Sequence, residues 1–329
     1  MLELEFKKIS EDTMNVMENS VSSNHDFYEY AVKSVESLLG DGEVHLLNSA
    51  NSCLIALAEC VPEPVLVQDM GGWNGFIKSC ELFNKKVVKI ETDYALINIK
   101  ILKKYLKENT VNTLYITTPA SYTARQPLKE IYDLCNIHEV ILIVDISGSL
   151  GDKTQTEHAD IQVASTGTPK IVNIENGGII NNKTQKIKLN KHLLKSLKAD
   201  KITCAGIANE IPKAAKIECK TRKQNQYLKE KLEKKLETDS LHNIIHPECE
   251  GINTIITAES KSKAKKLAYN INQRIKTERK IITTGPNYNR IKKASINIET
   301  KNIDPDSLTK ENMDKLAEIV AEEIERINL

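Results

Sequence analysis

The chain reads VDISGSLGD at residues 144–152, ADIQVASTGTPK at residues 159–170 and IVNIENGGII at residues 171–180. Apolar runs over residues 140–144 and 160–164 predict two strands, which end on Asp145 and Ser165. A turn rich in Gly, Thr and Pro then presents Lys170, and Gly177-Gly178 opens a further strand. The carboxylate, the hydroxyl and the amine would therefore meet at strand ends, where open α/β sheets bind their ligands.

Upstream of this block, strand patterns alternate with helix patterns. We expect strands at residues 43–48, 65–68, 86–90 and 113–118, and helices at residues 53–60, 76–83, 97–107 and 128–135. Such alternation indicates βαβ units, and hence a three-layer α/β sandwich with a mainly parallel sheet. Right-handed crossovers would bring the loops after the strands to one rim of that sheet.

The pattern divides the chain into three parts. We expect a helical arm at residues 1–40, a large ligand-binding domain at 41–205, and a linking helix with a small α+β domain at 206–329. In the last part, charged helices are expected at residues 186–198 and 207–236. Strands at 251–257 and 292–298 and helices at 261–275 and 307–327 would then complete the small domain.

Composition excludes several classes of protein. The 46 basic residues nearly balance the 45 acidic ones among 329, which argues against binding of nucleic acid or membrane surfaces through bulk charge. We expect neither a membrane span nor a signal peptide. The seven cysteines lack a Cys-x-x-Cys pair and indicate reduced thiols in a cytoplasmic protein, with no disulfide frame and no metal site.

Two further loops offer groups for a ligand. Ser49-Ala50-Asn51 lies between a strand and a helix, where it forms either an ordinary helix cap or a cup for a phosphate made by free amides and the positive helix end. Trp73, the sole tryptophan, lies in the glycine-rich loop Asp69–Gly75. It either fills the core or offers a flat face that stacks on a planar ring.

These residues together resemble fold-type I pyridoxal-phosphate (PLP) enzymes, most closely the DegT/DnrJ/EryC1/StrS aminotransferase-like family. That family carries a strand ending Glu-Asp-Ala-Ala-Gln, then Gly-Asp-Ile, a Ser-Phe-x-x-x-Lys turn and a Gly-Glu-Gly-Gly run. Here the same order appears at residues 144–148, 159–161, 165–170 and 175–178. Residues 49–57 are similar to the family's Ser-Gly-Thr-Ala-Ala-Leu phosphate turn. The resemblance covers roughly residues 40–185.

The resemblance implies a pyridoxal 5'-phosphate cofactor and assigns roles to the residues quoted above. Lys170 would form the internal aldimine and later move the α-proton, and Asp145 would keep the pyridine nitrogen protonated. Ser165 and the amides of Ala50 and Asn51 would hold the phosphate, and Trp73 would stack on the ring. The family also implies a homodimer.

Two departures from the family pattern concern the cofactor and the substrate. Gly148 stands where the family has Gln, so Ser147 or Ser149 must substitute for it or nothing does. The small domain has no clear arginine for a substrate carboxylate. Arg125 and Arg290 are the candidates, each with the alternative of being a surface arginine.

We expect an aminotransferase acting on an amino compound. The alternatives are β-elimination or β-replacement, as in a lyase or a selenocysteine-synthase-like enzyme, and a non-catalytic relative that serves as a binding protein. A desulfurase would need a cysteine on a mobile loop. Cys204, Cys219 and Cys249 are the cysteines outside expected core helices, and none has a supporting motif.

Overall fold

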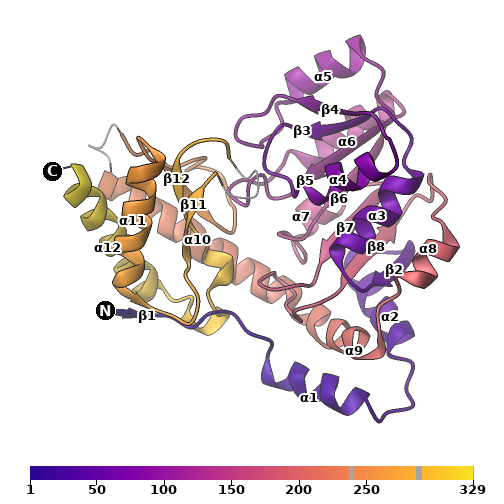
Figure 1. Cartoon of the computed structure of the whole chain (residues 1–329), viewed down its shortest axis with the longest axis horizontal. Coiled ribbons are helices and arrows are strands. Elements are labelled where there is room, and N and C mark those ends of the chain that lie inside the picture. The colour runs from indigo at the N-terminus through magenta and orange to yellow at the C-terminus, as the bar shows by residue number, and fades with distance from the viewer. Residues whose placement is uncertain (237–240, 287–290, 329) are drawn as a thin grey trace.

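The computed structural model describes residues 1–236, 241–286 and 291–328. Figure 1 shows two units, a larger one around a broad sheet and a smaller one around a narrow sheet. The long helix α10 (Ala214–Leu236) begins beside the larger unit and runs into the smaller one. The chain thus contains a larger and a smaller unit that are joined through α10.

The larger unit is built on a seven-stranded sheet in the order β2-β8-β7-β6-β5-β3-β4. Its strands are β2 (Glu43–Leu47), β3 (Val65–Gln68), β4 (Val87–Ile90), β5 (Thr113–Thr117), β6 (Ile141–Asp145), β7 (Ile161–Ser165) and β8 (Gly178–Asn182). Strands β3 to β7 are parallel, whereas β8 is antiparallel to both of its neighbours. The predicted mainly parallel sheet is confirmed.

Helices cover both faces of this sheet. One face packs against α3 (Ala50–Cys60), α4 (Gly75–Leu82) and α8 (Lys191–Ser196). The other packs against α2 (Phe27–Leu39), α5 (Ile99–Glu108), α6 (Leu128–Ile137) and α9 (Lys201–Glu210), while the short α7 (Lys153–Thr156) follows β6. Side chains alternate between the faces as a strand requires, with Leu114 and Ile116 on one side and Tyr115 on the other. The expected three layers are thus present.

The smaller unit is α+β. Its antiparallel sheet has the order β11-β12-β9, formed by β9 (Thr254–Thr257), β11 (Ile282–Gly285) and β12 (Ser295–Ile298). Helices α11 (Lys261–Gln273) and α12 (Lys310–Asn328) pack with α10 around a buried core that includes Leu228, Leu267, Ile296 and Leu316. This core is separate from those of the large sheet, so each unit has its own hydrophobic centre.

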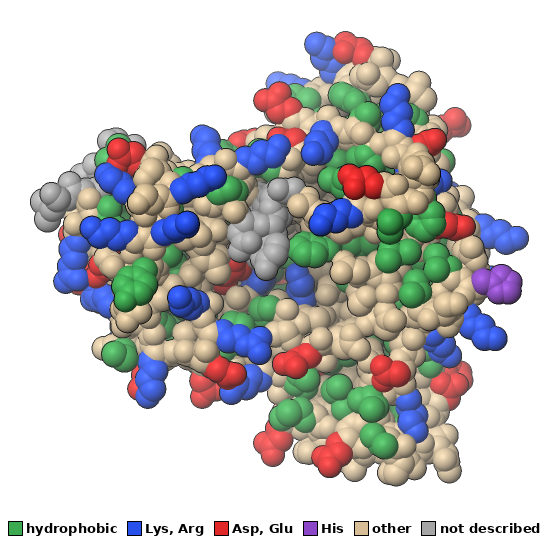
Figure 2. Space-filling view, viewed as in Figure 1, with side chains coloured by type: hydrophobic (Ala, Val, Ile, Leu, Met, Phe, Trp, Pro, Cys, Tyr) green, Lys and Arg blue, Asp and Glu red, His purple; other side chains and the backbone are tan. Residues whose placement is uncertain are grey.

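The surface of the smaller unit is rich in lysine. On the face shown in Figure 2, basic side chains gather over this unit, with acidic side chains among them. In α11, Lys261, Lys265 and Lys266 are exposed while Ala264 and Leu267 are buried, so this helix turns a basic face to solvent. None of the helices in the described ranges combines the length and apolar character that crossing a membrane requires.

The first 40 residues do not form a single helical arm. β1 (Leu2–Glu3) pairs with β10 (Ile275–Lys276), and Leu4 and Phe6 join the core of the smaller unit. After α1 (Glu11–Ser20), α2 packs into a core of the larger unit. The reason is visible in the pattern Leu2-Glu-Leu4-Glu-Phe6, whose alternation suits an extended strand rather than a helix.

Two helices also differ from expectation. Residues 207–236 are interrupted by the 3₁₀ turn Ile211–Lys213, which separates α9 from α10. Pro212 has no N–H to donate to the helical ladder, which explains the break. Of residues 186–198, only Lys191–Ser196 is helical, and β11 is a strand that the sequence pattern does not predict.

Replacing Phe6 with Ala tests whether the N-terminal segment belongs to the small core. We expect Phe6→Ala to lower the free energy of unfolding by about 3–5 kcal/mol, because loss of this buried aromatic side chain would leave a cavity. Chemical denaturation measures the effect, with Glu5→Ala as the control because the neighbouring Glu5 is exposed. Equal stabilities of the two variants would show that this segment frays from the core.

Candidate functional site

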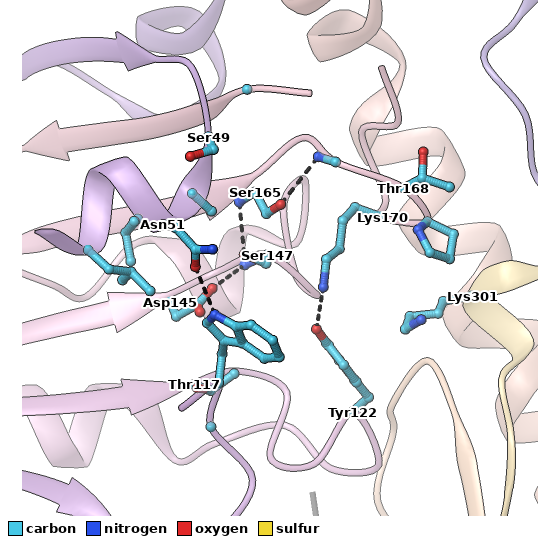
Figure 3. A pocket seen from close by; sticks show the side chains of 18 of the residues that line it. Ser49, Asn51, Thr117, Tyr122, Asp145, Ser147, Ser165, Thr168, Lys170 and Lys301 are labelled. Carbon is cyan, nitrogen blue, oxygen red and sulfur yellow. Dashed lines mark hydrogen bonds between the residues drawn. The ribbon is translucent and has the colours of Figure 1, made fainter. Parts of the chain in front are cut away.

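A cavity of about 540 Å³ lies at the carboxyl ends of the strands, between the two units. The turn between β2 and α3, the loop before α4, the ends of β6 and β7 and the connection from β7 to β8 all contribute to its wall. So does the segment after β12 of the smaller unit (Figure 3). Among the predicted site residues, the wall includes Ser49, Ala50, Asn51, Trp73, Asp145, Ser147, Ser165 and Lys170.

Asp145 ends β6 with its carboxylate at the cavity and only 8% of the residue exposed. Its Oδ2 accepts a hydrogen bond from the Tyr115 hydroxyl at 3.0 Å, and its Oδ1 accepts one from the Ser147 amide at 3.0 Å. Burial first, and then the Asp145 charge, raise the pKa of Tyr115 well above its usual range, so Tyr115 remains a donor. The carboxylate is therefore fixed in orientation and can pair with a ligand N–H.

The start of α3 presents backbone amides to the same cavity. Ser49 caps the helix by accepting a hydrogen bond from the Ser52 amide at 3.2 Å, so the capping interpretation holds. Ala50 and Asn51, in the first turn, line the cavity, so the start of α3 is also placed to bind an anion through its free amides. A Cβ on Gly178 would lie 2.6 Å from the Ala50 nitrogen, so glycine is what lets β8 start beside this turn.

Two serines join the ends of β6 and β7. The Ser165 amide donates to Ser147 Oγ at 2.8 Å, and the Gly167 amide donates to Ser165 Oγ at 3.2 Å. Both hydroxyls keep their own proton for a further hydrogen bond, because in these contacts they act as acceptors. The pair fixes the start of the connection that carries Lys170.

Trp73 does not fill the core. The residue is 44% exposed, it lines the cavity, and its indole Nε1 donates to Asn51 Oδ1 at 2.9 Å. The core interpretation of Trp73 is therefore wrong, and a flat aromatic face is available beside the start of α3.

Lys170 contacts a residue that the sequence did not reveal. Its Nζ donates to the Tyr122 hydroxyl at 2.8 Å, and Figure 3 shows the two side chains pointing toward each other across the cavity. A Cβ on Gly148 would lie 2.5 Å from the Tyr122 ring, so the missing side chain at position 148 makes room for this tyrosine. Of its serine neighbours, Ser147 lines the cavity, while Ser149 donates to the Thr118 carbonyl at 3.3 Å.

The smaller unit supplies a second cation to the wall. Lys301 lies 3.2 Å from Glu299 Oε2, and its Nζ is 5.4 Å from the centre of the Tyr122 ring. Glu299 also accepts hydrogen bonds from Asn253 at 2.7 Å and Thr283 at 2.9 Å. The run Thr-Lys-Asn at residues 300–302 looks like an ordinary surface turn in the sequence, and no motif marked it.

The two arginines considered for a carboxylate are not part of the described wall. Arg125 donates to Asp152 Oδ2 at 2.8 Å and to Glu250 Oε2 at 2.6 Å, and it is absent from the cavity lining. It therefore links the units as part of an ion-pair cluster rather than facing a ligand. Arg290 lies outside the described residues.

Comparisons with known proteins give a family match over part of the chain and a fold match over all of it. Residues 215–321 match the MJ1341 family C-terminal domain. No curated protein sequence matches the chain. The Sphingomonas wittichii serine palmitoyltransferase superposes with a TM-score of 0.77 at 9% identity, covering 98% of this chain and 88% of that one.

A NifS-like protein gives a TM-score of 0.75 at 14% identity and covers 99% of both chains. The NifS-like protein of Rickettsia africae gives 0.72 at 15% identity, covering 100% of this chain and 99% of that one. Another similar structure is a serine palmitoyltransferase from S. paucimobilis with bound PLP, with a TM-score of 0.76 at 10% identity, covering 99% of this chain and 88% of that one. This chain therefore has the fold-type I architecture of PLP-dependent transferases.

Replacing Gly148 with Ala tests the packing of Tyr122. The added methyl group would overlap the Tyr122 ring, and we expect a loss of about 1–3 kcal/mol in the free energy of unfolding from overpacking. Gly167→Ala is the matched control, since a Cβ there would meet Ser165 Oγ at 3.4 Å. Denaturation curves that coincide for the two variants would contradict the close approach of Tyr122.

Proposed function

We propose that this chain is a pyridoxal 5'-phosphate-dependent enzyme that acts on an amino compound, with Lys170 as the residue that holds the cofactor aldehyde. The observation that carries the proposal is that Lys170, the Asp145 carboxylate and the first amides of α3 line one cavity. The similarity in fold to PLP-bound structures supports the same cofactor.

The residues present fit the chemical groups of this cofactor. Ala50 and Asn51 amides with the Ser165 hydroxyl suit its phosphate, because free N–H groups at a helix start attract anions. Asp145 suits the pyridine N–H, and Trp73 offers a face for the ring. Gly72, where a Cβ would approach Thr117 Oγ1 to 3.3 Å, keeps space open on the cavity wall.

The bound cofactor would supply an electron sink for a carbanion next to the substrate nitrogen. This chain's residues do the rest of the work. Asp145 stabilises a proton on the pyridine nitrogen, and Lys170 moves a proton at the substrate α-carbon. Tyr122 holds the Lys170 amine by the 2.8 Å hydrogen bond, which restrains its position when it acts as base.

Within this class we favour transamination, in line with the DegT/DnrJ/EryC1/StrS resemblance. Lys301 lies in the cavity wall beside its ion-pair partner Glu299, and we infer that an acidic group on the substrate shares this ammonium group. Among the described residues no cysteine lines the cavity, and burial and Glu248 raise the pKa of Cys249 to about 11. A thiol-dependent desulfurase reaction is therefore less well supported.

The proposed enzyme is a homodimer, as the resemblance implies. Sedimentation equilibrium of the holoprotein measures this directly, and a fully active monomer would contradict it.

The cofactor assignment predicts a yellow protein after addition of pyridoxal 5'-phosphate. Borohydride should fix the cofactor covalently on the peptide that contains Lys170, because a reduced Schiff base is stable to digestion. Mass spectrometry of the digest identifies the site. Lys170→Ala should abolish the adduct, whereas Lys301→Ala is the control and should retain it. An unchanged adduct in Lys170→Ala would refute the role of Lys170.

Asp145→Asn separates cofactor binding from turnover. The amide fits the same space and preserves most contacts, so we expect the cofactor to bind. The neutral side chain no longer favours the protonated ring nitrogen, and turnover should fall by about 100-fold or more. Spectral changes on adding amino acids and amino sugars identify a substrate, and steady-state kinetics measure the fall. Unchanged rates would remove Asp145 from this role.

A further inference from the structure

Two lysines that the site does not use are buried next to its two central residues. Lys7 is 4% exposed and donates from Nζ to the carbonyl of Ile171, the residue after Lys170, at 3.0 Å. Lys229 is fully buried and donates to the carbonyl of Thr123, the residue after Tyr122, at 2.7 Å. Each side of the Lys170–Tyr122 hydrogen bond is thus held by a buried ammonium group.

Both lysines act from the smaller unit. The Lys7 amide donates to the carbonyl of Asn302, a residue of the cavity wall, at 2.8 Å, and the preceding Phe6 lies in the small core. Lys229 belongs to α10, which packs on α12. The connection carrying Lys170 and the turn carrying Tyr122 both belong to the larger unit, so each lysine spans the boundary between the units.

The Tyr122 turn has further contacts of the same kind. The carbonyl of Tyr122 accepts hydrogen bonds from the amides of Ile252 at 2.8 Å and Asn253 at 3.0 Å. Lys229 also donates to the carbonyls of His246 at 2.8 Å and Cys249 at 2.7 Å, which fixes the loop before β9. The position of Tyr122 is therefore set by the segment between α10 and β9 as much as by its own sheet.

Burying these two charges is costly, which argues that their acceptors matter. Burial lowers the pKa of Lys7 to about 8 against the opposing charges of Glu210 and Asp304, and it lowers the pKa of Lys229 to about 8 as well. An apolar side chain of similar length would avoid this desolvation, but it would leave the facing carbonyls without a donor.

We propose that Lys7 and Lys229 are positioning residues. Lys7 holds the connection that carries Lys170, and Lys229 holds the turn that carries Tyr122, each in a fixed position relative to the smaller unit. When the smaller unit moves, both halves of the Lys170–Tyr122 pair must move with it or break these hydrogen bonds. A movement of the cavity wall at residues 299–302 would therefore also move the amine of Lys170. The effect on catalysis rests on the proposed function, whereas the positioning of the two segments does not.

The positioning of the two segments is tested by hydrogen exchange in the cofactor-free protein. Lys7→Met should speed exchange at the Ile174 amide, which donates to Thr166, by about tenfold while leaving the Tyr122 amide unchanged. Lys229→Met should do the reverse. The matched controls are Lys8→Met and Lys234→Met, since both residues are exposed neighbours of the tested lysines. Exchange of the β5 core amides reports on global unfolding.

The consequence for the site is tested in the holoprotein by titrating the visible absorption band with pH. Lys7→Met and Lys229→Met should each shift the pH midpoint of this titration by about half a pH unit or more, whereas the control variants should not. In a Tyr122→Phe background, Lys229→Met should add no further shift, because Lys229 acts through Tyr122. If Lys229→Met does not fold, Lys7→Met and Lys7→Gln carry the test. The glutamine keeps a donor and should retain more protection.

Uniformly faster exchange across the protein, or a lowered melting temperature with an unchanged absorption midpoint, would overturn the proposal and leave both lysines as general stabilisers. A wild-type protein that binds no pyridoxal 5'-phosphate would instead refute the proposed function. In that case the exchange pattern still decides whether the two lysines position the connection and the turn.

Discussion

The pairing of β7 with β8 is the constraint on which the site depends. Because Ser165 lies opposite Gly178, the chain must leave the parallel sheet at its carboxyl edge and return to the same edge. Everything between these residues, including Lys170, is therefore held above the ends of the neighbouring strands. Glycine at position 178 lets this return pass within van der Waals distance of the start of α3, and so brings the lysine and the helix amides to one cavity.

Much of this arrangement could be predicted from the sequence because it is local. Apolar runs that end in Asp145 and Ser165 fix where the strands stop, and parallel strands place such ends on one edge. The glycine pair and the serine-rich turn at Ser49 are likewise visible as short motifs. The positions of these residues follow from where the strands and the helix begin and end, and they therefore line the same cavity.

Tyr122 and Lys301 could not be predicted, because their positions depend on contacts between distant segments. Tyr122 reaches Lys170 only because position 148 lacks a side chain and because the backbone at residues 252–253 binds its carbonyl. Lys301 enters the wall because the smaller unit docks beside the sheet. The strand at Leu2–Glu3 was missed for a similar reason, since its partner Ile275–Lys276 lies at the other end of the sequence. No local propensity reports such pairings.

The departure at Gly148 can now be given a physical meaning. A side chain at this position would occupy the space of the Tyr122 ring, so the chain can have one or the other but not both. A polar side chain on the turn after β6 would be held by the larger unit alone. Tyr122, in contrast, sits on a turn whose carbonyls are bound by the smaller unit and by Lys229. The hydrogen bond that positions the Lys170 amine therefore depends on the boundary between the units and not on the sheet alone.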